Sequence, residues 1–347
     1  MTAPVYDLTV MAQLFWVAFV AAGLAAWPIY RWLLRIGSRQ IISDYVPEHQ
    51  AKQGTPTMGG MILLVGFLAA GAYAVAARLF AGPLLGVALV LFGGFALIGF
   101  LDDFMVPRLL RGKRGLGWKQ KFVLQIAVSL GAAMAMRHGA LTVGAVFAAI
   151  VILFYSNAFN FSDGMDGLAG GLLLLLAAGL AGLGLIEGRH VLAGALCAGL
   201  AGASLPFLFL NAPPARVFMG DVGSLPVGAV LGLVVAEFLR PGIRAAAAPG
   251  PILFGLQTPQ PVAGLLQTGL PILLLSVLMI FELVPVPIQI ASVKLTGKRV
   301  FPMTPIHHAF QKAGWPESRV VWLFLLVQLM LTALALSMAL GQPGSGT

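Results

Sequence analysis

The chain has 347 residues, 59% of them hydrophobic and only 10% charged, with a mean hydropathy of +0.94. This composition excludes an ordinary water-soluble protein and indicates an integral membrane protein. The formal net charge of +9 fits basic loops on the cytoplasmic side and contact with anionic membrane lipid, so we expect no nucleic acid among the partners.

Ten uncharged stretches are long enough, or nearly so, to cross a hydrocarbon core of about 30 Å. In chain order they are 8–30, 57–77, 79–101, 122–136, 139–162, 167–186, 191–215, 222–236, 265–281 and 320–340. The fourth and eighth are short and need interfacial residues such as Trp118 and Phe238. We expect an all-α polytopic membrane protein with about ten transmembrane helices in a single integral-membrane domain, residues 1–347.

Lysine and arginine positions predict the orientation, because positive residues in short loops stay on the cytoplasmic side. Most of the 21 such residues become cytoplasmic if both termini lie outside. The expected cytoplasmic loops are 31–56, 102–121, 157–166, 211–221 and 284–319, and an outer loop spans 240–264. The first span precedes its basic cluster, so we expect an uncleaved anchor.

Most of the 12 acidic residues fall in the expected cytoplasmic segments, and five aspartates lie directly against span ends. These are Asp102, Asp103, Asp163, Asp166 and Asp221. A carboxylate at the bilayer centre costs roughly 2.5–3.5 kcal/mol, so several near the hydrocarbon edge need a partner. Helix capping explains one such residue, whereas five from three loops indicate a bound cation. Because the recurring donors are oxygens, Mg²⁺ is favoured over zinc.

The segment NAFNFSDGMDGLAGG carries four polar residues at intervals of three: Asn157, Asn160, Asp163 and Asp166. If the turn is helical, they line one face and form a polar recognition surface. Backbone capping is the alternative for the two asparagines.

Two other segments carry candidate binding residues. In NAPPARVFMGDVGSLPVG, Asn211 opens the set, Phe218 either stacks on a base or belongs to the core, and the Gly220 region offers backbone N–H groups to a phosphate. In AKQGTPTMGG, Lys52 and Thr57 precede the second span. The lysine is either a topology signal or a phosphate contact.

Adjacent histidines, His307 and His308, lie in the long loop that contains PMTPIHHAF. Because no cysteine and no third histidine is near them in the sequence, phosphate contact or proton transfer is favoured over metal binding.

In this order and between spans, TPTMGG, FLDD, NAFNFSDGMDGLAGG, VFMGDVGSLPVG and TGKRVFPMTPIHHAF resemble the phospho-N-acetylmuramoyl-pentapeptide transferase family. That family belongs to the polyprenyl-phosphate N-acetylhexosamine-1-phosphate transferase superfamily. The match runs from about Ser43 to Trp315. One motif departs from the family pattern of three histidines, a phenylalanine and an acidic residue, because Ala309 replaces the third histidine and Gln311 the acid.

The resemblance implies transfer of phospho-N-acetylmuramoyl-pentapeptide from UDP-N-acetylmuramoyl-pentapeptide to undecaprenyl phosphate. The products are lipid I and UMP, used in peptidoglycan synthesis. It also implies a bacterial inner-membrane location, an active site at the cytoplasmic face, Mg²⁺ as cofactor and a homodimer as the assembly.

By motif position, the resemblance implies Asp221 as the Mg²⁺ ligand, Asp102 as a base toward the lipid phosphate, Asp103 as a supporting carboxylate and His307 as a phosphate contact. A lipid phosphate is already ionised at neutral pH, so the need for a base stays open. The residues implied to line the nucleotide and sugar region are Lys52, Thr57, Asn157, Asn160, Asp163, Asp166, Asn211, Phe218, Gly220 and His308.

Two other functions are weighed against this one. Within the superfamily, a transferase that uses UDP-N-acetylglucosamine is the alternative, and such relatives typically differ at TPTMGG and PIHHAF. From another class, a secondary transporter would place ionisable groups near the bilayer midplane and commonly show two related halves. The clustering of carboxylates at one face disfavours a transporter.

Overall fold

The structure, a computed structural model, describes residues 3–37, 54–80, 82–110, 115–188, 190–245, 249–253, 256–259 and 268–341. The first helices in chain order are α1 (Ala3–Ile36), α2 (Met61–Ala76), α3 (Leu84–Phe100), the π-helical turn η2 (Leu101–Met105), α4 (Val106–Leu109), α5 (Trp118–Ala135) and α6 (Val143–Ser162). They are followed by α7 (Leu168–Glu187), α8 (Val191–Asn211), α9 (Asp221–Ala245), α11 (Leu270–Leu283), α12 (Pro285–Thr296), α13 (Ile306–Lys312) and α14 (Glu317–Leu340).

All ten predicted spans form helices, and eight helices are long and apolar enough to cross a membrane among the described residues. In lipid a backbone must satisfy its own polar groups, which is why hydropathy predicts such helices well. Two of the ten predicted spans fall outside the eight: α2 has only 16 residues, and α5 carries polar side chains at Lys119, Lys121 and Gln125. The prediction of an all-α polytopic membrane protein is confirmed for the bundle.

Several predicted boundaries need correction. The helix of the third span continues through Asp102 and Asp103 to Leu109, so the predicted loop 102–121 begins as helix. The predicted loop 284–319 contains α12 and α13. The predicted outer loop 240–264 begins inside α9 and contains two antiparallel strands, β1 (Pro249–Leu253) and β2 (Leu256–Pro259), which the sequence pattern did not indicate.

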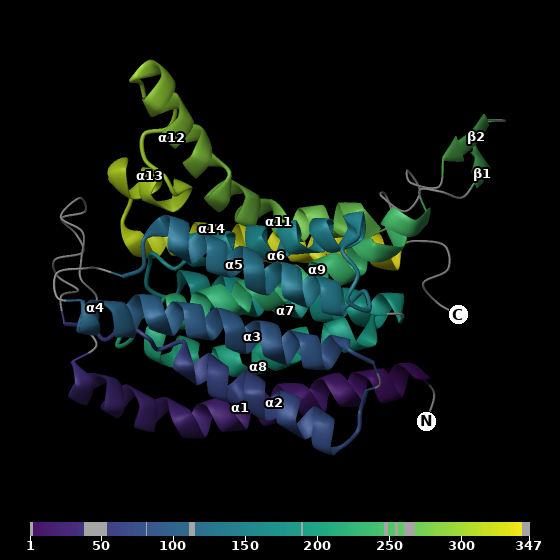
Figure 1. Cartoon of the computed structure of the whole chain (residues 1–347), viewed down its shortest axis with the longest axis horizontal. Coiled ribbons are helices and arrows are strands. Elements are labelled where there is room, and N and C mark those ends of the chain that lie inside the picture. The colour runs from purple at the N-terminus through teal and green to yellow at the C-terminus, as the bar shows by residue number, and fades with distance from the viewer. Residues whose placement is uncertain are drawn as a thin grey trace.

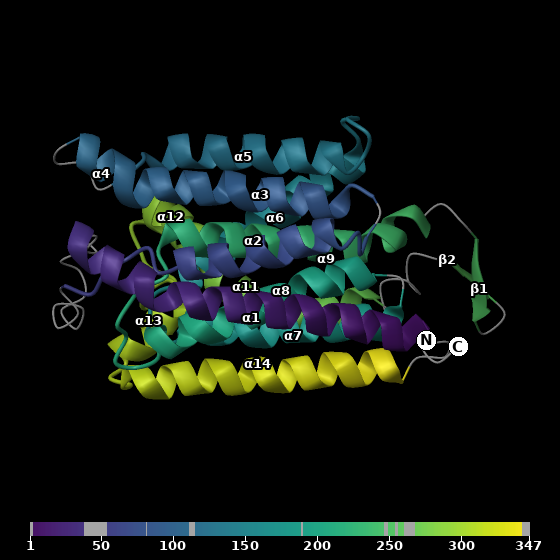
Figure 2. The same ribbon diagram turned by 90° about the horizontal axis from the view of Figure 1, so that it is seen from below.

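The long helices lie roughly parallel in one bundle, with α12 projecting from it (Figure 1). In the view from below, α5 and α14 form opposite edges of the bundle, and α9 lies between them (Figure 2). Contacts between α6 and α9, α3 and α9, and α1 and α8 are among the most extensive. The start of α1 and the end of α14 lie at one end of the bundle, and α4 and α13 lie at the other.

Close packing of small residues brings α3 to the start of α9. A Cβ atom on Gly99 would overlap the backbone carbonyl of Asp221, so only glycine allows this approach. In lipid, helices associate through such van der Waals packing, because the hydrocarbon is as apolar as the side chains. The contact places the turn η2, one residue beyond α3, beside the first residue of α9.

Candidate active site

Three carboxylates gather where η2 meets the start of α9. Asp102 and Asp103 lie on η2, and Asp221 is the first residue of α9. A carboxylate oxygen from each lies within 4.8 Å of the other two. A π-helical turn is an uncommon feature that is frequently found at functional sites. This is a group of oxygen donors of the kind that could hold a divalent cation.

A lysine on α5 joins two of these carboxylates. The Nζ atom of Lys121 lies 3.2 Å from Oδ2 of Asp102 and also donates to Oδ2 of Asp221. The Lys121 side chain is only 20% exposed. One buried ammonium group therefore offsets part of the negative charge of the cluster through charge-assisted hydrogen bonds. The sequence pattern assigned Lys121 to topology alone, although a lysine directly before the predicted span 122–136 was a usable signal.

The two adjacent aspartates have different partners, because neighbouring residues on a helix point in different directions. Asp102 accepts a hydrogen bond of 2.6 Å from the backbone N–H of Leu116. Asp103 accepts one of 3.1 Å from the backbone N–H of Val222, in the first turn of α9. The unpaired N–H groups and the dipole at a helix start favour a negative charge there.

Asn160 fixes the third carboxylate. Its Nδ2 atom donates to Oδ1 of Asp221 at 2.7 Å and lies 2.9 Å from the hydroxyl oxygen of Ser224. The other asparagine of the motif lies apart, because Asn157 donates to Gln125 on α5 at 3.0 Å. The predicted face shared by all four polar residues does not include Asp163 and Asp166, because α6 ends at Ser162.

Asp163 lies beyond the end of α6 and holds the turn before α9. Its Oδ2 atom accepts a hydrogen bond of 3.0 Å from the backbone N–H of Gly220. Asp163 thus engages the N–H that was predicted to contact a phosphate, and the phosphate contact of Gly220 stays a prediction. Burial raises the pKa of the Asp163 carboxyl well above its usual range; the Gly220 N–H lowers it, and the nearby charge of Asp221 adds to the rise.

Asp166 and Asn211 fasten neighbouring loops. Asp166 accepts from the backbone N–H of Ala215 at 2.9 Å, and its own N–H donates to Glu317 at 2.7 Å. Asn211, 1% exposed, accepts from the N–H of Gly167 at 3.0 Å. These contacts give both residues a structural role, and their predicted contact with substrate stays a prediction.

The segment that contains Thr57 pairs with the segment that contains Phe218. The backbone N–H of Phe218 donates to the carbonyl of Pro56 at 2.9 Å, and the N–H of Gly59 donates back to Phe218 at 2.7 Å. This pairing holds Thr57, which is buried, beside the turn at Gly220. Lys52 lies outside the described residues.

The two histidines lie on α13, against the turn that follows α6. Nδ1 of His307 lies 2.8 Å from Oε2 of Glu282 on α11, and Nδ1 of His308 lies 2.8 Å from Oε1 of Gln311. A Cβ atom on Gly164 would lie 2.6 Å from Nε2 of His307. The structure thus brings His307 to the motif that contains Asp163, and it reveals Glu282, which the motifs did not indicate.

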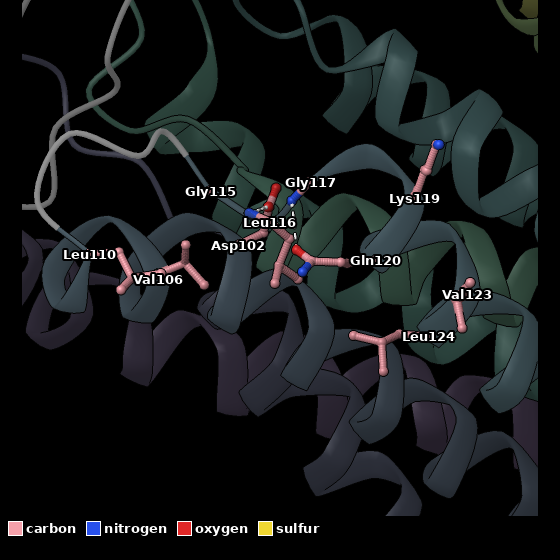
Figure 3. A pocket seen from close by; sticks show the side chains of 10 residues that line it. All are labelled: Asp102, Val106, Leu110, Gly115, Leu116, Gly117, Lys119, Gln120, Val123 and Leu124. Atoms are coloured by element: carbon pink, nitrogen blue, oxygen red, sulfur yellow. Dashed lines mark hydrogen bonds between the residues drawn. The ribbon is translucent and has the colours of Figure 1, made fainter.

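A cavity of about 1030 Å³ opens beside the carboxylates. In Figure 3, Asp102 lies between Val106 and Leu110 on one side and Val123 and Leu124 on the other. A second cavity of about 550 Å³ lies between α6, α9 and α11, with a mainly apolar lining. The residues lining this second cavity include Phe154, Tyr155, Val235, Leu239, Leu273, Ser276 and Ile280.

The carboxylate cluster lies in a polytopic membrane bundle whose residues 84–238 match glycosyl transferase family 4. The chain belongs, more narrowly, to the phospho-N-acetylmuramoyl-pentapeptide transferase family. Proteins named phospho-N-acetylmuramoyl-pentapeptide-transferase are 34% identical to it in Francisella philomiragia, over 89% of this chain and 87% of the relative. The identity is also 34% in Heliobacterium modesticaldum, over 95% and 99%, and in Acetivibrio thermocellus, over 87% of each chain. The resemblance carried by the sequence motifs is confirmed.

Proposed function

We propose that this chain transfers phospho-N-acetylmuramoyl-pentapeptide from UDP-N-acetylmuramoyl-pentapeptide to undecaprenyl phosphate, giving lipid I and UMP in peptidoglycan synthesis. The observation that carries the proposal is the cluster of Asp102, Asp103 and Asp221 at one end of a membrane bundle, in a chain one-third identical to named transferases over nearly its whole length. An oxygen of the lipid phosphate bonds to the sugar-bearing phosphorus, and the bond from that phosphorus to UMP breaks.

Such a reaction needs positioning and charge neutralisation more than covalent help from the protein. The donors fit Mg²⁺, because all are oxygens and because Asn160 and the N–H of Val222 hold two of the carboxylates in place. Asp221 would ligate the ion, with the η2 aspartates beside it. When bound, Mg²⁺ would offset the charge of the diphosphate. Lys121 supplies a second positive charge at the same carboxylates.

We infer that the acceptor phosphate binds at Asp102; the support is that the cavity of about 1030 Å³ reaches this residue and continues between apolar side chains. Val106 and Leu110 on one wall and Val123 and Leu124 on the other suit the first isoprenoid units of the lipid. In this position Asp102 faces the attacking phosphate, as its implied role as base requires.

Narrowing this cavity should weaken use of the lipid. Val123→Trp, at a position 62% exposed, is expected to raise KM for polyprenyl phosphate about tenfold, since it displaces roughly 1–3 kcal/mol of apolar contact. KM for the nucleotide substrate should stay unchanged. The matched variant is Leu273→Trp in the second cavity, 50% exposed. If Leu273→Trp raises the lipid KM and Val123→Trp does not, the lipid uses the second cavity.

The donor is a cytoplasmic nucleotide, so we place this end of the bundle at the cytoplasmic face of the bacterial inner membrane. The lysine and arginine distribution supports this orientation, with both termini outside. The homodimer stays a prediction.

The decisive test offers UDP-N-acetylmuramoyl-pentapeptide and UDP-N-acetylglucosamine separately to the purified protein, with polyprenyl phosphate and Mg²⁺ in detergent. We expect UMP release and lipid-linked product with the first donor alone. Product from UDP-N-acetylglucosamine alone would assign the chain to the related transferases. A transporter would release no UMP with either donor.

A further inference from the structure

A buried pair of ionisable side chains lies against the turn that follows α6. Glu282 on α11 and His307 on α13 are both 0% exposed, and their Oε2 and Nδ1 atoms are 2.8 Å apart. Two such side chains are expensive to bury unless they face each other. The pair joins elements that are separate in the chain, and it orients the imidazole.

The far side of the imidazole faces a motif of the site. A Cβ atom on Gly164 would lie 2.6 Å from Nε2 of His307 and 3.4 Å from Nε2 of His308. Within the described part of the chain, Nε2 of His307 is buried and has no hydrogen-bond partner. A buried polar nitrogen without a partner is unusual. Nε2 therefore faces the turn between Asp163 and Asp166, where glycine at position 164 leaves open the space that a side chain would fill.

We propose that Glu282 is a positioning residue for His307, and that together they direct an Nε2–H donor at the diphosphate of the nucleotide substrate. This inference rests on the proposed function. Glu282 fixes Nδ1 as a donor and supplies the negative charge that offsets a positively charged ring. Nε2 is then left to donate to a phosphate oxygen. In the same way, the aspartate of a serine protease triad orients a histidine and stabilises its positive charge.

The test is Glu282→Gln, which keeps the size and an acceptor oxygen but removes the charge. We expect kcat/KM for UDP-N-acetylmuramoyl-pentapeptide to fall about tenfold to hundredfold, with KM for polyprenyl phosphate unchanged. The thermal unfolding midpoint should be retained, because glutamine keeps an acceptor oxygen for the Nδ1–H of His307 and the imidazole can become neutral, so that no unpaired charge stays buried. The matched control is Glu237→Gln, which removes a carboxylate paired with Arg240 on α9, roughly 24 Å along that helix from Asp221. Glu237→Gln should leave kcat/KM for the nucleotide substrate and KM for polyprenyl phosphate unchanged.

A double variant separates positioning from a structural role. If Glu282 acts only through His307, then Glu282→Gln causes no further loss in a His307→Ala background. Wild-type kcat/KM in Glu282→Gln would overturn the proposal, and so would an additive loss in the double variant or an equal weakening of both substrates with a lower unfolding midpoint. Failure of the proposed function is distinct from these outcomes, because the unaltered protein would then release no UMP from this donor.

Discussion

Asp221→Asn is expected to lower kcat for UMP release about a thousandfold at saturating Mg²⁺. Removal of one preorganised electrostatic contact in an active site typically costs 10²–10³-fold in rate, and Asp221 makes several. Its Oδ1 atom accepts from Asn160 at 2.7 Å and its Oδ2 atom faces Lys121. Asparagine keeps the shape and removes the charge, so the loss reports on the carboxylate and not on packing.

The measurement is the rate of UMP release from UDP-N-acetylmuramoyl-pentapeptide, with polyprenyl phosphate in detergent, across a series of Mg²⁺ concentrations. Asp7→Asn is the matched control, because Asp7 lies near the start of α1, at the opposite end of the bundle from α4 (Figure 1). The control should behave as the unaltered protein. Activity of Asp221→Asn close to that of the control, with unchanged Mg²⁺ dependence, would remove Asp221 from the metal site.

Hydropathy predicted the positions of the spans because lipid allows only backbones that satisfy their own hydrogen bonds. It placed helix ends less well, since ends depend on local contacts. The helix after the third span continues through η2 to Leu109. The hairpin of β1 and β2 lacks an apolar signal of its own. Such features follow from packing and turn geometry, which composition does not report.

The motifs predicted the carboxylates of the site but not the residues that complete it. Lys121 and Asp221 are separated by 100 positions in the chain. They meet because α5 packs on α3 and because Gly99 lets α3 approach the start of α9. Glu282 lies at the cytoplasmic end of the predicted span 265–281, yet nothing in the sequence pairs it with His307. Long-range partners of this kind require the fold, whereas Asp102, Asp103 and Asp221 stand out because charges at span ends are rare.

Lys121→Met is expected to lower kcat about a hundredfold while lowering the Mg²⁺ concentration that gives half-maximal activity. The two effects have different causes. The ammonium group of Lys121 offsets negative charge beside the reacting phosphates, and losing one such contact typically costs 10²–10³-fold in rate. The same ammonium contacts Oδ2 of both Asp102 and Asp221, which are oxygens that a cation would use. Without Lys121, these like charges repel each other, and a divalent cation gains from neutralising them.

Lys294→Met provides the control, because Lys294 is exposed on α12, the helix that projects from the bundle (Figure 1). Removing an exposed charge of this kind should change kcat little. The value of kcat and the half-maximal Mg²⁺ concentration are both obtained from UMP release measured against Mg²⁺ concentration. An unchanged kcat in Lys121→Met would show that the ammonium only ties α5 to the cluster, whereas a higher half-maximal Mg²⁺ concentration would show that it supports the metal site instead of competing for its oxygens.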